Sequence, residues 1–336
     1  MKKKILFITT GGTIASAPTE AGLAPALSSG ELLAQLPEIG TLCEPDTLAL
    51  CSLDSTNIGP EHWLLLARAI RRNYSKYDGF IISHGTDTLA YTAAALSYLI
   101  QNSHKPIILT GAQTPICSEI TDAKKNLRDS VLCALDPASF GVMVVFGGMV
   151  IAGTRAKKVK TYSYNAFDSI NFPYLAQVQE NRLVRYIQTP MPSGPAVFYD
   201  NLDDRAFLLK LTPGIQPELL GHIFEQYDCI LLESFGVGGV PDNLVEELAA
   251  QMGRYAPGEK LLIMTTQVPY EGSDVGIYAV GRQLQQRVHL LEARDMTLEA
   301  AYTKAMWIMG QKDLTFEQIE DLFYCRINYD IFCCDR

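Results

Sequence analysis

Three short segments of the sequence place hydroxyl and carboxylate side chains beside glycine. Residues 10–13 read TGGT, residues 84–87 read HGTD, and residues 54–56 read DST. A threonine hydroxyl is a weak nucleophile at neutral pH and needs a neighbouring base. A desolvated lysine can act as that base, and a carboxylate can orient it. The three segments therefore predict hydroxyl-based chemistry if the fold brings them together.

The first segment has two interpretations. Gly11 and Gly12 let the backbone turn tightly and approach a ligand closely in front of Thr13. A phosphate-binding loop is disfavoured, because neither GxGxxG nor GK followed by Ser or Thr is present. Catalysis at Thr13 and a turn without chemistry both stay open from these residues alone.

The second segment is also ambiguous. Asp87 precedes a predicted helix, and aspartate is a good helix N-cap, so capping alone could explain it. The functional interpretation is that Thr86 and Asp87 lie at a strand end and face the threonine of the first segment.

A basic stretch could supply the lysine. Residues 153–160 read GTRAKKVK and offer Lys157, Lys158 and Lys160. A solvated basic surface is the alternative, and spacing alone does not choose among the three lysines.

Other chemistries find little support. The five histidines show neither HxH nor HExxH spacing, so no metal site is predicted. No GxSxG motif is present, which disfavours an α/β-hydrolase. We expect His84 to be a buried, hydrogen-bonded residue that supports its loop.

Short apolar runs alternate with helical patterns around these segments. Strands are predicted over residues 4–9, 47–53, 79–83, 106–110 and 142–146, and helices over 61–77, 88–101 and 122–135. Fully apolar strands that alternate with helices indicate a parallel sheet covered on both faces. Ligands bind outside the carboxyl ends of such strands, where the three polar segments fall.

A second domain is predicted after a proline-rich break. Residues 190–195 read PMPSGP, which cannot extend a helix or a central strand, so we expect a linker over 186–206. It separates a catalytic α/β domain, residues 1–185, from a smaller α/β domain, residues 207–336. There we predict strands at 206–211, 229–232 and 261–265, and helices at 216–226, 243–254, 278–286 and 297–309.

Composition narrows the partners and the compartment. A formal charge of −9 disfavours nucleic acid as a partner. The apolar run at residues 5–8 is shorter than the roughly 7–15 residues of a secretory signal, and no run reaches the roughly 18 of a membrane span. The eight cysteines form no CxxC pair, which fits free thiols in the cytoplasm.

Two motifs together carry a family resemblance. TTGGTIAS and HGTDTLAYTAAALSYL resemble the signatures of bacterial-type L-asparaginases, most closely those of the cytoplasmic type I branch. LDSTNI, KPIILTGAQ, TDAKKNL, GTRAKKVK, YNAFDSINFP, FGVGG and DMTLEAAYTK have counterparts in the same order. The resemblance therefore covers nearly the whole chain.

The resemblance implies roles by position. Thr13 matches the threonine usually held to be the nucleophile, and Thr86, Asp87 and Lys158 match the second threonine with its partners. Lys158 is the matching lysine because it stands nine residues before Phe167 of NAFDSIN. The expected substrate-binding set is Gly12, Asp54, Ser55, Thr56, Gly85, Thr86 and Asp87. Of these, Ser55 and Thr56 match the pair that holds the α-carboxylate and α-amino group.

The implied reaction is hydrolysis of L-asparagine through an acyl-enzyme, in a homodimer or a dimer of dimers without metal or organic cofactor. Backbone N–H groups near Gly12 and Thr86 would stabilise the oxyanion. Direct attack by water stays open, as does weak acceptance of glutamine. The rivals are the asparaginase-like subunit of archaeal glutamyl-tRNA amidotransferase, which carries an extra N-terminal domain, and an amino-acid sensor without turnover.

Two positions depart from the family pattern. Leu23 stands where many members have a lid tyrosine, and Gly239 stands where some secreted members contribute an asparagine to a neighbouring subunit. We expect residues 16–29 to form a lid over bound substrate.

Overall fold

The structure is a computed structural model that describes residues 2–19, 22–25, 27, 29–188, 190–277 and 279–332, with side chains at 17–19, 22–25 and 279–280 left out. It divides into two compact units, Met1–Asp200 and Asn201–Arg336. Both are built from parallel strands and helices, so the predicted α/β class and the pair of domains are confirmed.

An eight-stranded sheet forms the first unit, in the order β13-β12-β9-β8-β7-β5-β1-β4. Its parallel part comprises β4 (Glu44–Leu53), β1 (Lys4–Gly11), β5 (Gly79–Ser83), β7 (Pro106–Thr110) and β8 (Gly141–Phe146). These are the five strands expected from sequence, although β4 begins earlier. All five residues of β5 and of β7 are buried, which explains why each strand is apolar up to its last residue.

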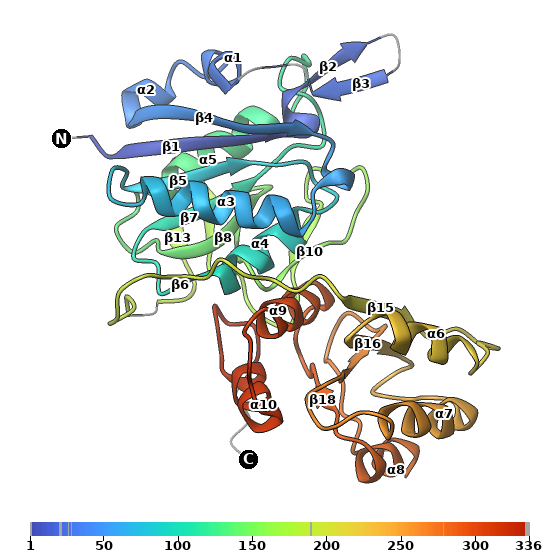
Figure 1. The fold of residues 1–336 in the computed structure, drawn as a ribbon. Helices are drawn as coiled ribbons and strands as arrows, with labels where there is room; N and C mark the ends of the chain where they lie inside the picture. Colours follow the sequence, from blue (N-terminus) through green and yellow to red (C-terminus); the bar gives the residue numbers. More distant parts are fainter. Residues whose placement is uncertain are drawn as a thin grey trace. The chain divides into compact units, whose positions relative to one another are not determined.

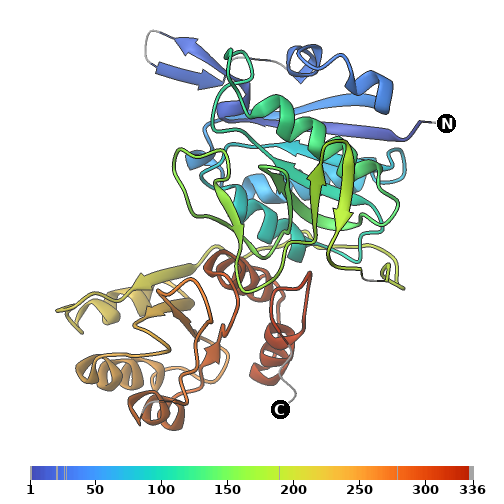
Figure 2. The ribbon, with the colours of Figure 1, turned by 180° about the vertical axis from the view of Figure 1, so that it is seen from behind.

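Helices cover both faces of this sheet. α3 (Pro60–Asn73) and α4 (Leu89–Leu99) lie on one face, and α5 (Ala123–Leu135) lies on the other (Figures 1 and 2). The three helices match the predicted ones, with ends that differ by up to four residues. They fix the direction in which the loops after the parallel strands leave the sheet.

The far edge of the sheet is antiparallel, which sequence analysis did not anticipate. β9 (Met149–Ala152) folds back on β8, and β12 (Ala176–Gln179) and β13 (Arg182–Arg185) follow it. Gly147 and Gly148 make this turn with φ of +58° and +83°, a backbone that glycine adopts without strain. The lysine-bearing stretch therefore follows β9 rather than β8.

The lysines themselves sit at a small ribbon. β10 (Ala156–Lys158) pairs antiparallel with β11 (Phe167–Ser169), and Lys158 lies opposite Phe167. The remaining minor elements of the unit were not predicted: β2 (Ser16–Thr19), β3 (Gly22–Pro25), α1 (Ser29–Ala34), α2 (Ile39–Leu42), β6 (Ile100–Gln101) and β14 (Val197–Phe198).

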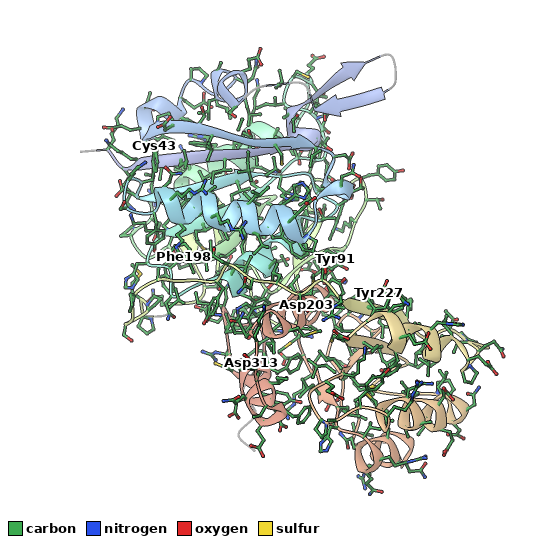
Figure 3. All side chains as sticks on the ribbon, in the orientation of Figure 1. Cys43, Tyr91, Phe198, Asp203, Tyr227 and Asp313 are labelled. Carbon is green, nitrogen blue, oxygen red and sulfur yellow. The ribbon has the colours of Figure 1, made fainter. Side chains whose placement is uncertain are left out.

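The end of the first unit is tied to its body. β14 pairs with β6, and the ring of Phe198, labelled in Figure 3, lies 5.3 Å from the ring of Tyr74 in an edge arrangement. The chain passes into the second unit between Asp200 and Asn201.

The second unit contains a parallel sheet of β15 (Ala206–Lys210), β16 (Cys229–Ser234), β17 (Leu261–Thr266) and β18 (Leu291–Glu292). Its helices are α6 (Leu219–Gln226), α7 (Asp242–Met252), α8 (Ala279–Arg287), α9 (Leu298–Met309) and α10 (Phe316–Tyr324). Side chains of α6, α7 and α8 pack on the face that carries Ile230, Leu232 and Met264. The sequence predicted these elements except β18 and α10; position 278, the expected start of α8, is outside the described residues.

Within the described ranges, no helix is long and apolar enough to cross a membrane. The six cysteines that the structure describes are free thiols, and burial raises the pKa of Cys133 to about 11.

Candidate active site

Four neighbouring parallel strands end at one edge of the first sheet. Residues 54–56 follow β4, residues 12–13 follow β1, residues 84–87 follow β5, and residues 111–113 follow β7. The carboxyl ends of parallel strands meet at the same edge, so the three segments singled out in the sequence come together there.

Direct packing of two glycines brings the first two segments into register. A Cβ on Gly12 would collide with the Cα of Gly85, and a Cβ on Gly85 would lie 3.2 Å from the Cα of Gly12. That same Cβ would lie 2.7 Å from the Cβ of Ser55. Thr13 and Thr86 each follow one of these glycines, so both threonines leave from contacting backbones.

Thr13 is half-buried and begins a short 3₁₀ turn, Thr13–Ala15. The carbonyl of Gly12 accepts bonds from the Ala15 N–H and the Ser16 hydroxyl. The N–H of Gly12 donates to Leu53 O at 2.9 Å. Because that N–H is engaged, Gly12 itself is the wrong donor for an oxyanion, and in this segment the N–H groups that follow it in the turn are the candidates.

Thr86, Asp87 and Lys158 form one hydrogen-bonded group. Lys158 Nζ lies 2.8 Å from Thr86 Oγ1 and 2.6 Å from Asp87 Oδ1. Thr86 is buried, with 6% of its surface exposed, whereas the Asp87 side chain is half-exposed. Of the three candidate lysines, Lys158 is the one for which these contacts are found.

Asp87 does not cap a helix. The residue before α4 is Thr88, and its side chain makes no capping bond; its hydroxyl donates to Ser55 O at 2.6 Å. The capping interpretation of Asp87 is therefore wrong, because the helix begins two residues later and the carboxylate binds Lys158.

The segment after β4 lies against the same loop. Ser55 is buried, and its hydroxyl accepts a bond from the Asp87 N–H at 3.3 Å. Asp54 Oδ1 accepts from the Thr56 N–H at 2.9 Å and from the Thr56 hydroxyl at 2.7 Å. The Thr56 bonds hold the pKa of Asp54 below its usual range. Asp54 thus orients Thr56 at the exposed rim of the site.

His84 is fully buried and supports the loop, as predicted. Its Nδ1 lies 2.7 Å from Gly85 O, and its Nε2 lies 2.9 Å from the Thr92 hydroxyl. A backbone carbonyl only accepts, so Nδ1 must carry the imidazole proton; in the neutral ring Nε2 then accepts from the Thr92 hydroxyl, whose oxygen accepts from Trp63 Nε1 at 3.0 Å. Desolvation lowers the pKa of His84 to about 4, which keeps the ring neutral.

Gln113 touches the site but was missed as a site residue. Thr86 Oγ1 donates to Gln113 Oε1 at 3.2 Å, and Gln113 Nε2 donates to Thr161 O at 2.8 Å. The strand-end rule applied to β7 would have found it, because Gln113 lies three residues beyond that strand.

Leu23 and Gly239 are the two positions that depart from the family pattern. The side chain of Leu23 lies outside the described residues, so the expected closure of residues 16–29 over the substrate stays a prediction. Gly239 lies in a tight turn of the second unit, where it exchanges backbone hydrogen bonds with Phe235. Among the residues the structure describes, no three His, Cys, Asp or Glu side chains group as a metal site would require.

Comparison with known proteins gives one consistent picture. The family model described as asparaginase, N-terminal, matches residues 4–191, and that of the glutaminase/asparaginase C-terminal domain matches residues 205–323. An L-asparaginase of Thermococcus kodakarensis is 40% identical over 91% of this chain and 93% of its own length. Its solved structure superimposes with a TM-score of 0.90 over 98% of this chain and all of that one.

A differently named relative matches as well. One subunit of the glutamyl-tRNA(Gln) amidotransferase of Methanosphaera stadtmanae is 32% identical over 95% of this chain and 75% of its own length.

Proposed function

This chain belongs to the asparaginase family, and we propose that it hydrolyses L-asparagine to L-aspartate and ammonia with a threonine nucleophile. The observation that carries the proposal is the position of Lys158 Nζ, within hydrogen-bond distance of both Thr86 Oγ1 and Asp87 Oδ1. A hydroxyl, an amine and a carboxylate in this order are the parts needed to move a proton on and off a reacting amide.

In the first half-reaction, Thr13 Oγ1 attacks the side-chain amide carbon and its proton passes to the departing nitrogen, which leaves as ammonia. The half-buried position of Thr13, at the end of β1, leaves its hydroxyl accessible to a small substrate. The N–H groups of the turn that starts at Thr13, and that of Thr86, would stabilise the oxyanion.

In the second half-reaction, water replaces ammonia. Thr86 and Lys158 activate the water, the acyl–oxygen bond to Thr13 breaks, and one water proton restores the Thr13 hydroxyl. Asp87 holds Lys158 in place at 2.6 Å. Thr86 is buried and Asp87 half-exposed, so the relay runs from the interior of the site toward solvent.

The α-substituents of asparagine would bind at the rim. Ser55 and Thr56 suit the α-carboxylate and α-amino group, Asp54 orients Thr56, and Asp87 faces the ammonium. The packing of Gly12, Gly85 and Ser55 fixes the distance from this rim to Thr13. Glutamine is one methylene longer, and we propose that it is hydrolysed only weakly.

The proposal also covers the compartment, assembly, cofactors and partners of the enzyme. We infer a cytoplasmic homodimer or dimer of dimers that needs neither a metal nor an organic cofactor and binds neither nucleic acid nor membrane.

An ammonia assay tests the function. The purified chain, treated with EDTA, is incubated separately with L-asparagine, L-glutamine, D-asparagine and D-glutamine. Ammonia release with L-asparagine as the best substrate supports the proposal. Release from glutamine alone, or release that depends on added glutamyl-tRNA, would favour the amidotransferase role instead. Binding of asparagine without any release would favour the sensor.

A further inference from the structure

Gln113 is held by three contacts around the proposed catalytic threonine. Its Oε1 accepts from Thr86 Oγ1 at 3.2 Å, its Nε2 donates to Thr161 O at 2.8 Å, and its backbone N–H donates to the buried Asp122 carboxylate at 3.0 and 3.1 Å. A backbone carbonyl only accepts, so the nitrogen of the carboxamide must face Thr161. The oxygen therefore faces Thr86.

These contacts fix the direction of the Thr86 proton. A lysine ammonium has only donors, so Thr86 Oγ1 must accept from Lys158 across the 2.8 Å contact. The single hydroxyl proton of Thr86 is then left for Gln113 Oε1. When Lys158 has released a proton, the Thr86 proton can turn toward Nζ, and Gln113 Oε1 loses its donor.

We propose that Gln113 is a positioning residue that holds the Thr86 hydroxyl proton away from Lys158 until the lysine has released its own proton. The inference rests on the proposed roles of Thr86 and Lys158. It adds that the amide of Gln113 favours the resting, charged state of the lysine, and that its 3.2 Å bond must break before each proton transfer.

Several other charged side chains lie on the surrounding elements. They include Asp87 before α4, Asp54 after β4, Lys157 and Lys160 on or beside β10, Asp168 on β11, Asp122 behind Gln113, and Lys124, Lys125, Arg128 and Asp129 on α5; His84 is buried and neutral. α4 carries no charged residue. These other charged groups are the same in every variant at position 113, so the variants report on the Thr86–Lys158 pair.

The test is the pH dependence of kcat/KM in matched variants. Gln113→Met keeps the length but removes the acceptor, and one neutral hydrogen bond corresponds to about a fivefold change in proton affinity. The acid limb of the profile should move to lower pH by about 0.7 unit. Gln113→Glu places a carboxylate beside the ammonium, so its acid limb should move to higher pH. The exposed Gln216→Met in the second unit should leave the profile unchanged.

Each result of this test either supports or overturns the inference about Gln113. Opposite movements of the two limbs support the inference, and if Gln113→Met does not fold, the upward shift of Gln113→Glu alone decides it. Unmoved limbs overturn it, as does a higher KM without a shift, which would make Gln113 a substrate contact. Lys158→Met distinguishes failure of this inference from failure of the proposed function. If Lys158→Met is inactive while the acid limbs of the Gln113 variants do not move, the inference fails and the proposed function stands. If it is active, the function itself fails.

Discussion

Gly12 and Gly85 pack backbone against backbone, with no room for a side chain between them. The contact joins the carboxyl ends of β1 and β5, which are neighbours in the sheet. Each glycine immediately precedes one of the two threonines on which the proposed chemistry depends, so the distance between Thr13 and Thr86 is set by this contact.

Gly12→Ala should therefore damage catalysis more than folding. Its Cβ would meet the Gly85 backbone, and its φ of +76° is unfavourable for alanine. A displacement of about 1 Å at a reacting group can cost on the order of 10² in rate. Gly40→Ala is the matched control, because a Cβ at position 40 would meet nothing within 4 Å. Steady-state kinetics would contradict the account if both variants kept wild-type kcat.

The three lysines after β9 should separate cleanly. Lys158→Met should be inactive, because Thr86 and Asp87 both lose their shared partner. Lys157→Met and Lys160→Met should stay within about threefold of the wild type, since Lys158 supplies the ammonium that Thr86 and Asp87 bind. Equal loss in all three would remove the ground for choosing Lys158.

His84 should make stability depend on pH. The pKa is about 4 in the folded protein and 6.5 in the unfolded chain, so the unfolded chain binds more protons between these values. The stabilisation is complete above pH 6.5 and is lost as the pH falls toward 4, by about 3 kcal/mol in total.

Urea denaturation at pH 7 and pH 5 measures this effect. His84→Gln should be less stable at pH 7 but should show a smaller loss between the two pH values than the wild type. His222→Gln, at an exposed position, should behave as the wild type does. A wild-type loss that His84→Gln leaves unchanged would assign the dependence to other groups.

A fully buried ion pair links α9 to the end of the second unit. Lys304 Nζ lies 2.6 Å from Asp330 Oδ2, and neither side chain is exposed. Lys304→Met should destabilise the protein by about 3–5 kcal/mol, because the buried Asp330 carboxylate loses the ammonium that balances its charge. Adding Asp330→Asn should restore part of that loss, which chemical denaturation would detect. A single variant as stable as the wild type would show that the pair is not needed.

Sequence patterns predicted the parallel part of the first sheet because β5, β7 and β8 are mostly apolar and α3 and α5 carry apolar residues at helical spacing. They did not predict β9, since the turn depends on positive φ at Gly147 and Gly148 and not on hydrophobic periodicity. They also missed α10, although Thr315 and Gln318 form a capping box at its start, a signal that the sequence carries.

At the site, residue types predicted which segments carry chemistry, and the strand-end rule predicted where they meet. Spacing could not select Lys158, because that choice depends on the side-chain positions that the β10–β11 pairing creates. Position along the chain also misled the interpretation of Asp87, since a residue near a helix start resembles a cap until its partner is known.

The central claim is that the two threonines carry out the hydrolysis. The most direct test is kcat for ammonia release from L-asparagine by Thr13→Ala and Thr86→Ala, with circular dichroism to confirm the fold. Both threonines lie at strand ends, so the loss should be chemical, on the order of 10²–10⁶ in rate. Either variant, correctly folded and retaining more than about a tenth of wild-type kcat, would contradict the assignment.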